Sequence, residues 1–337
     1  MRVFVAGATG ALGRQLVPQL VARGHDVTGM TRSESKRDLV RSLGARPVVA
    51  DALDPDGVAQ TVAEAEPEVI VHQLTALSGE FDLRHADRYF EPTNRLRTEG
   101  TDHLLAAGRA VGARRFVAQS YAGPQAFART EGWVKSETDP LDTDPPDAMR
   151  PLIAAIRHLE AAVTGIDWGE GVVLRYGGFY GPGTGLSSDP EAVMSAAIRK
   201  RRFPLVGSGE SYWSFIQIED AAAATVEAVE HGTRGIYHVV DDEPAPTREW
   251  MPALADALHA KPPRHLPRWL TRLVAGEAAT MMMTEGRGAS NAKAKRELGW
   301  QPRYASWRQG FPAVYASSKA AEEGGAQATT RTAHSPT

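Results

Sequence analysis

The first half of the chain alternates short apolar runs with stretches of helical spacing. Residues 3–5 are all apolar, and Leu12, Leu16 and Leu20 then recur one helical turn apart, which predicts a buried strand followed by a helix. The alternation predicts further strands at 26–30, 46–50, 68–73, 114–120 and 171–176, and helices at 36–43, 55–65, 83–111 and 151–163. Strands and helices in alternation predict an α/β fold, a Rossmann-like doubly wound parallel sheet.

The second half of the chain has a mixed order of helices and strands. It predicts helices at 190–201, 220–229 and 247–258, a strand or turn at 203–207 and a strand at 235–240. We expect a dinucleotide-binding domain over 1–180 with 210–235 returning to it, a smaller substrate-binding lobe mainly over 181–317, and a disordered tail over 318–337. Residues 123–149, rich in acids and proline, are expected to form a functional loop.

The amino-acid composition excludes several kinds of binding partner. The 337 residues carry a net charge of −3 and include no cysteine, which excludes disulfides and thiolate metal sites and gives no electrostatic hold on nucleic acid. No apolar run reaches the length of a membrane span. We therefore expect a cytoplasmic protein, a monomer or homodimer, with no metal, nucleic acid or membrane partner.

A glycine-rich turn follows the first predicted strand. Gly7 suits a tight turn, Gly10 lets phosphates approach the backbone, and Gly13 lets the helix pack close to the strand. The start of the helix offers unpaired N–H groups and the positive end of its dipole to a pyrophosphate. The turn predicts dinucleotide binding by Gly7, Thr9, Gly10, Ala11, Leu12 and Gly13.

The residues after the second strand indicate which dinucleotide binds. An acid there selects NAD, but this chain has Arg32, whose guanidinium suits a 2′-phosphate. We expect NADP(H) to be preferred over NAD(H); alternatively, Arg32 is an exposed residue of a turn.

Two further strand ends are expected to meet the cofactor. Asp51 and Ala52 follow the third strand, where the adenine should lie, although Asp51 also suits a helix N-cap. Gln73, Leu74 and Thr75 follow the fourth strand and should pass under the second ribose and the nicotinamide. His72, beside them, is expected to be a satisfied strand-end histidine rather than a catalyst.

These motifs together resemble a known family. The glycine turn, Asp51, the segment 72–76, Ser120, Arg175 and the segment 179–183 resemble the extended short-chain dehydrogenase/reductases, also called the NAD-dependent epimerase/dehydratase family. Segments 213–221 and 293–302 resemble later signatures of that family. The resemblance covers about residues 1–315 and implies a nicotinamide cofactor, with Tyr176, Gly178 and Phe179 among its contacts.

The catalytic pattern departs from the family. Its members carry a Tyr and, four residues later, a Lys that lowers the pKa of the Tyr. With Glu160 as the register mark, this chain has Leu152 and Ile156 at those positions. Arg157 and His158 are adjacent, but one residue turns a helix by about 100°, so we expect them to face elsewhere.

The neighbouring positions differ as well. Arg97 stands where the family has an active-site Asn, with Asn94 close by, and Ser120 remains as the catalytic candidate.

Three functions remain open. The first is an atypical reductase, like those that modify aromatic polyketides, in which Ser120 hydrogen-bonds a ketone and the proton comes from water or from the substrate. Tyr121 and Tyr180 are substitute donors, although buried structural roles suit both. The second is a non-catalytic NADP(H) binder or sensor, and the third is a nucleotide-sugar epimerase or reductase.

The substrate is expected between the carboxyl ends of the strands and the second lobe. Methionines and aromatics in the candidate lining suit a bulky, flat, apolar ketone. The candidates are Leu77, Tyr121, Trp133, Tyr180, Trp213, Met281 and Met282. The basic run 199–202 is interpreted as a solvated helix end, with a sugar-nucleotide phosphate contact as the alternative.

Overall fold

The structure, a computed structural model, describes residues 1–77, 82, 84–123 and 131–315. The predicted tail at 318–337 lies outside the described residues, as does part of the expected loop at 123–149.

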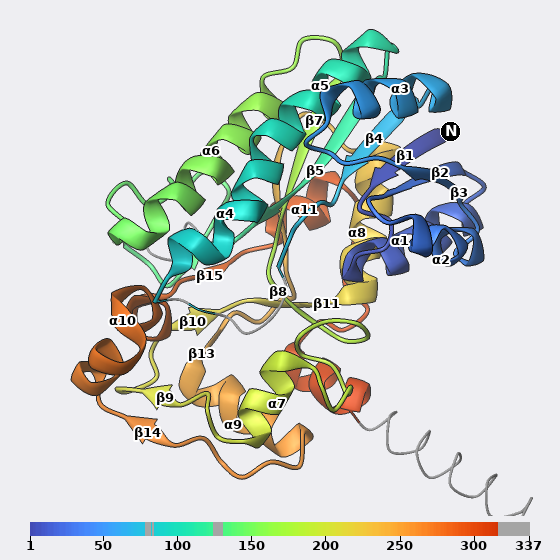
Figure 1. Ribbon diagram of the computed structural model, residues 1–337. Helices are drawn as coiled ribbons and strands as arrows, with labels where there is room; N and C mark the ends of the chain where they lie inside the picture. The colour runs from blue at the N-terminus through green and yellow to red at the C-terminus, as the bar shows by residue number, and fades with distance from the viewer. Residues whose placement is uncertain (78–81, 83, 124–130, 316–337) are drawn as a thin grey trace, which may run out of the picture.

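A seven-stranded parallel sheet forms the centre of the molecule (Figure 1). Its strands, in spatial order, are β12 (Gly235–Val239), β7 (Glu170–Tyr176), β5 (Arg115–Tyr121), β4 (Val69–His72), β1 (Arg2–Ala6), β2 (Asp26–Thr31) and β3 (Arg46–Val49). The order reverses direction at β1, as in a doubly wound sheet. The predicted α/β fold is confirmed, and the strand expected at 235–240 is the seventh strand, beside β7.

Helices cover both faces of this sheet because successive side chains of each strand point to opposite sides. Val3 and Val5 lie in one apolar core, and Phe4 and Ala6 lie in the other. The first core is closed by α1 (Ala11–Ala22), α2 (Arg37–Ser42), α8 (Ile218–His231) and α11 (Ala292–Glu297). The second is closed by α3 (Pro55–Ala65), α5 (Glu99–Ala110) and α6 (Arg150–Thr164), and α4 (Ala86–Arg97) packs on α6.

A smaller lobe lies at the carboxyl end of the sheet (Figure 1). Its helices are α7 (Val193–Arg199), α9 (Thr247–Ala257) and α10 (Arg268–Glu285). Short strand pairs connect it: β8 (Gly178–Tyr180) with β11 (Phe215–Gln217), β9 (Leu205–Val206) with β14 (His265–Leu266), β10 (Tyr212–Trp213) with β13 (Ala245–Pro246), and β6 (Val134–Lys135) with β15 (Gly288–Ala289). Phe215, Trp250 and Trp307 are fully buried in its own core.

Two helices differ from the sequence prediction. The single helix expected at 83–111 is broken at Thr98, where ψ is −84°, so α4 and α5 are separate. Helix α10 was not predicted, and Gly276 interrupts its helical geometry with a φ of +87°. A break of this kind disrupts the apolar periodicity by which a helix is identified in a sequence.

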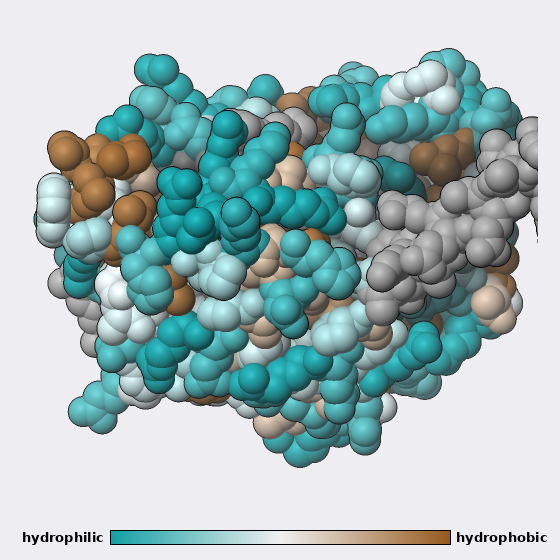
Figure 2. Space-filling model, turned by 90° about the horizontal axis from the view of Figure 1, so that it is seen from below, coloured by the Kyte–Doolittle hydropathy of each residue, from teal (hydrophilic) through white to brown (hydrophobic). Residues whose placement is uncertain are grey.

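Helix α10 carries three exposed apolar side chains. Trp269, Leu273 and Val274 are 69%, 67% and 59% exposed. Figure 2 shows apolar surface at the left-hand edge of the molecule, the side on which α10 lies in Figure 1. Among the described residues, no helix combines the length and the apolar character that a membrane span requires.

Candidate functional site

The glycine turn joins β1 to α1 in a conformation that side chains would disrupt. Gly7 has a φ of +96°, and a Cβ there would lie 2.9 Å from the Gln73 carbonyl oxygen. A Cβ on Gly13 would lie 2.3 Å from the Gly7 oxygen. Gly10 is the N-cap of α1 and supplies no side-chain cap, so the first N–H groups of the helix stay available to a phosphate. The turn fits a dinucleotide pyrophosphate.

The residues predicted to select the cofactor lie at the same edge. Arg32 follows β2 and is exposed, which leaves its guanidinium available to a 2′-phosphate. The Asp51 carboxylate accepts a hydrogen bond from the Leu53 backbone N–H at 3.0 Å. The N-cap of α3 is Asp54, so Asp51 does not cap that helix. Ala52 is buried.

The end of β4 holds a neutral histidine. His72 is 1% exposed, and burial lowers its pKa to about 4. Its Nδ1 accepts from the Leu74 N–H, and its Nε2 lies 3.1 Å from the Thr101 hydroxyl. Both ring nitrogens are therefore engaged, as expected of a structural strand-end histidine. The adjacent Gln73 is buried, and its Oε1 has no hydrogen-bond partner among the described residues.

Ser120 belongs to a buried charge cluster. The Glu160 carboxylate accepts both a bidentate pair from Arg175, at 2.7 and 2.6 Å, and the Ser120 hydroxyl at 2.8 Å. All three residues are at most 5% exposed. The only proton of Ser120 is thus directed at Glu160. In this structure the Ser120 hydroxyl therefore satisfies a buried carboxylate, and its expected contact with a substrate carbonyl stays a prediction.

A second guanidinium lies beside this cluster. Arg97, on the last turn of α4, is 5% exposed, and its Nη1 has no hydrogen-bond partner among the described residues. Burial lowers its pKa to about 10, and the Glu160 charge opposes that shift. Burial also raises the pKa of the Tyr121 hydroxyl, against the positive charge of Arg97. Both groups therefore keep their protons at neutral pH.

The two positions that the sequence analysis aligned with the family's Tyr and Lys are apolar in space as well as in sequence. Leu152 and Ile156 are 4% and 0% exposed and pack in one cluster with Phe90 and Met281. Their neighbours on α6 face other partners. His158 Nε2 lies 2.8 Å from the Asp102 carboxylate, and Arg157 donates to the Asp142 carbonyl at 3.4 Å. Neither substitutes for the lysine in this structure.

A pocket opens at the carboxyl ends of β5 and β7, facing the lobe. Tyr121, Trp213, Met282 and Gly178, all singled out from the sequence, line it together. Ala122 and Gly123 line it too, so its wall begins one residue beyond Ser120. Most of the lining is glycine and alanine, with the side chains of Tyr121, Trp213 and Met282 among them, which suits an organic substrate with an apolar ring.

The one charged residue among the described lining residues is Arg287, which sequence analysis missed. Its guanidinium carbon lies 4.2 Å from the centre of the Trp133 ring, and Trp133 stacks on Tyr212 with centroids 5.3 Å apart. Trp133, predicted as a substrate contact, thus supports the pocket wall. The signal in the sequence was an arginine flanked by two glycines, four residues after the methionine run.

Other predicted contacts lie elsewhere. Tyr180 is fully buried in the lobe core against Phe311, at 5.0 Å, so it does not contact substrate. Met281 packs with Leu152 rather than with the pocket. Tyr176 is buried, its hydroxyl bonds Thr225 at 2.6 Å, and its carbonyl accepts from the Ala122 N–H at 3.1 Å; its predicted cofactor contact stays a prediction. Phe179 packs against Tyr176, and Leu77 is 48% exposed. The predicted roles of Leu77 and Phe179 stay predictions.

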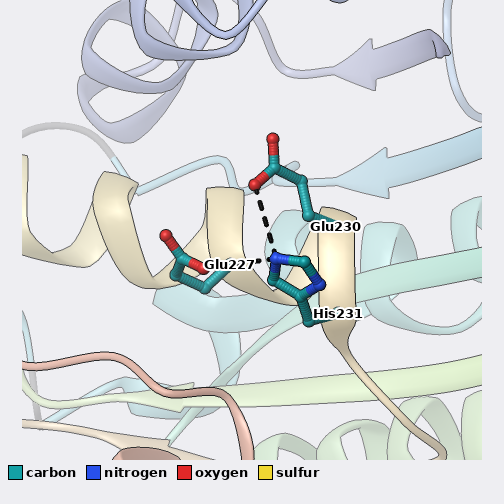
Figure 3. A group of neighbouring side chains, drawn as sticks. All are labelled: Glu227, Glu230 and His231. Carbon is teal, nitrogen blue, oxygen red and sulfur yellow. Dashed lines mark ion pairs between the residues drawn. The ribbon is translucent and has the colours of Figure 1, made fainter.

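One group of described side chains has the spacing of a metal site. Glu227, Glu230 and His231 converge at the C-terminal end of α8 (Figure 3). Arg23 already pairs with both carboxylates, at 2.8 and 2.7 Å. This end of α8 precedes β12 and so lies at the amino edge of the sheet, opposite the pocket.

Comparison with known proteins places this geometry in a family. The model of the NAD dependent epimerase/dehydratase family matches residues 3–240. The chain belongs to this family. The resemblance stated from the motifs is therefore confirmed, and with it a nicotinamide cofactor and an oxidoreductase activity.

Three similar proteins of known name indicate the type of reaction and the cofactor. The chain is 45% identical to the 3-diazoavenalumate denitrifying reductase of a Streptomyces species, over 92% of this chain and 99% of that protein. It is 27% identical to a farnesyl-dihydroquinoline-oxide ketoreductase of Stigmatella aurantiaca, over 93% and 96%. The solved UDP-glucose 4-epimerase of Thermus thermophilus in complex with NAD is 25% identical, with a TM-score of 0.70 over 94% and 98%. The protein is an NAD(P)-dependent reductase.

Proposed function

We propose that this family member is an NADPH-dependent reductase that removes a diazo group from an aromatic substrate as dinitrogen. The observation that carries the proposal is the apolar packing of Leu152 and Ile156, where a proton-donating Tyr and its Lys would otherwise stand. The relative at 45% identity, named for the denitrification of a diazo compound, supports the same conclusion.

The chemistry explains why such a site needs no acid. Hydride adds to the ring carbon that bears the diazonium group, a C–H bond forms, and the C–N bond breaks with its electron pair leaving on dinitrogen. The carbon that loses dinitrogen needs no proton. Where a hydroxyl beside the diazonium group has ionised, hydride addition leaves a phenolate, which takes its proton from water rather than from a residue of the site. A ketone that accepts hydride becomes an alkoxide and must take a proton, which is the task of the Tyr in this family.

The residues of this chain would bind and orient the reactants. The glycine turn holds the pyrophosphate, and Arg32 holds a 2′-phosphate, which favours NADPH over NADH. When bound, the reduced nicotinamide supplies the hydride. Tyr121, Trp213 and Met282 pack against the substrate ring. The cluster that contains Leu152 and Met281 places apolar side chains at the two positions aligned with the family's Tyr and Lys.

Ketone reduction is the second candidate, and Tyr121 favours it. Its side chain lines the pocket, and its raised pKa keeps the phenol protonated at neutral pH. The Stigmatella relative is named a ketoreductase. In this case Tyr121, rather than Ser120, would donate the proton, and a substrate hydroxyl beside the carbonyl would assist.

Paired assays separate the two candidates. The purified protein is given NADPH with a diazotised 3-amino-4-hydroxycinnamate, a hydroxylated polycyclic ketone or a nucleotide-linked keto-sugar. NADPH oxidation is followed by absorbance and dinitrogen by headspace mass spectrometry. We expect one dinitrogen per NADPH with the diazo compound, and turnover within about threefold of wild type in Tyr121→Phe. Tyr304→Phe, outside the pocket, is the matched control.

Other outcomes would contradict the proposal. Reduction of the ketone with a hundredfold loss in Tyr121→Phe would make the protein a ketoreductase. Turnover of the keto-sugar would favour a nucleotide-sugar enzyme. Tight NADPH binding without reduction of any compound would favour a cofactor-binding sensor.

A further inference from the structure

Arg287 combines three properties that are unusual for a structural arginine. It is the charged residue in the described wall of an otherwise apolar pocket. Its guanidinium carbon lies 4.2 Å from the centre of the Trp133 ring, which itself stacks on Tyr212, so two aromatic rings support its position in the absence of a ligand. Its Nε is buried and has no hydrogen-bond partner among the described residues.

The guanidinium of Arg287 has N–H donors for which the described residues supply no acceptor. Nη1 donates to the Glu285 carbonyl at 2.7 Å, and the Glu285 carboxylate pairs with Arg268. A buried N–H without an acceptor is costly, and native structures rarely keep one without a ligand or water to satisfy it. The edge of the guanidinium that carries Nε therefore suits an anionic acceptor. A planar carboxylate satisfies that edge with two parallel hydrogen bonds.

We propose that Arg287 binds the carboxylate of an aromatic substrate and thereby orients its ring between Tyr121 and Trp213. This inference rests on the proposed function, since it specifies the substrate of the same site. A carboxylate matches the single charge of the wall, whereas the pyrophosphate of a nucleotide sugar would bring more negative charge than one guanidinium balances. The aromatic wall fits the conjugated remainder of the substrate.

Ligand binding tests the proposal without any turnover. The NADP⁺-loaded protein is titrated calorimetrically with trans-cinnamate, with cinnamamide and with UDP. We expect wild type to bind cinnamate at least about tenfold more tightly than cinnamamide. Arg287→Met should bind the two equally weakly, and Arg287→Lys should restore part of the preference, because it returns the charge but not the fork.

The control is Arg272→Met, since Arg272 is an exposed arginine paired with Glu277 outside the pocket. It should keep the wild-type preference. Equal binding of cinnamate and cinnamamide by wild type, or an unchanged preference in Arg287→Met, would overturn the proposal. UDP binding tighter than cinnamate, and lost in Arg287→Met, would reassign the residue to a phosphate. If wild type prefers cinnamate to cinnamamide but releases no dinitrogen in the turnover assay, the carboxylate site at Arg287 stands and the proposed reaction is wrong.

Discussion

The two ends of this active site follow the family to different degrees. At the nucleotide end, the turn at Gly7, Gly10 and Gly13 keeps the family pattern, and its geometry leaves no space for a Cβ at Gly13. At the reaction end, Leu152 and Ile156, which align with the family's proton-handling pair, pack into an apolar cluster. Under the proposed function, the chain keeps the residues that hold a hydride donor and has no Tyr–Lys pair to complete a ketone reduction. That combination suits a substrate whose reduction ends with the departure of a neutral gas.

The largest effect is expected at the nucleotide end. Gly13→Val places branched carbon where a Cβ would already lie 2.3 Å from the Gly7 oxygen, so the helix must move from the strand and cofactor binding should be lost. Gly100→Ala is the control, because its Cβ would meet ordinary contacts at 3.6 Å or more. NADPH affinity is measured by fluorescence titration. Retained affinity in Gly13→Val would show that the turn does not hold the cofactor.

Introducing the family's Tyr and Lys at positions 152 and 156 should destabilise the fold without raising activity. Ile156→Lys buries a charge in the cluster of Phe90 and Met281, and we expect the free energy of unfolding to fall by about 3–5 kcal/mol. Combined with Leu152→Tyr, it should give no gain in activity. Urea unfolding and turnover are compared with Leu152→Tyr alone. A stable double variant with higher ketone turnover would identify a decayed ordinary reductase.

Cofactor choice is tested at Arg32. Arg32→Ala removes the guanidinium proposed to hold a 2′-phosphate, a charged hydrogen bond worth about 1.5–3 kcal/mol. NADPH affinity should fall about 10- to 100-fold while NADH affinity stays level. Arg41→Ala, an exposed arginine paired with Asp38, is the matched control. If both dinucleotides bind Arg32→Ala as they bind wild type, Arg32 is a surface residue.

Acid should destabilise the protein through His72. Its pKa is about 4 in the folded protein, against an ordinary histidine value of 6.5, so the unfolded chain binds more protons between these values. Stability is therefore full above pH 6.5 and falls as the pH drops toward 4, by up to about 1.4 kcal/mol per pH unit. His238, whose pKa burial lowers to about 3, acts with the same sign.

Urea unfolding between pH 4.5 and 7.5 measures this slope. It should be shallower in His72→Gln and unchanged in His265→Gln, which alters an exposed histidine. An equal slope in wild type and His72→Gln would mean that His72 titrates normally in the folded state.

The smallest effect is expected at Ser120. Ser120→Ala removes one of three hydrogen bonds to Glu160 and should lower the free energy of unfolding by about 1–2 kcal/mol. Turnover should stay within about twofold. A hundredfold loss of turnover with unchanged stability would return Ser120 to the substrate.

The sequence predicted the sheet because its strands and helices are encoded locally, and the prediction of the nucleotide end rests on the same kind of local signal. A buried strand, a glycine turn and a helix are contiguous in residues 2–22, and their spacing alone defines the site. The break at Thr98 and the kinked helix α10 lack such periodicity, and neither was predicted.

The pocket depends on contacts between distant segments. Tyr121, Trp213 and Arg287 meet only because β5, β10 and the end of α10 converge. Ser120 was interpreted as catalytic from its place in a motif, but the direction of its hydroxyl depends on Glu160, forty residues away. No pattern of spacing in the sequence specifies that hydrogen bond.

The central claim is that hydride alone completes the reaction, and isotopic labelling tests it most directly. The diazo compound is reduced by unlabelled NADPH in D₂O, and the product is examined by mass spectrometry and proton NMR. We predict that the carbon that lost the diazo group carries protium, and that NADPH deuterated on its transferred position places deuterium there in ordinary water. Deuterium arriving at that carbon from D₂O would contradict the account, because the site would then be supplying a proton.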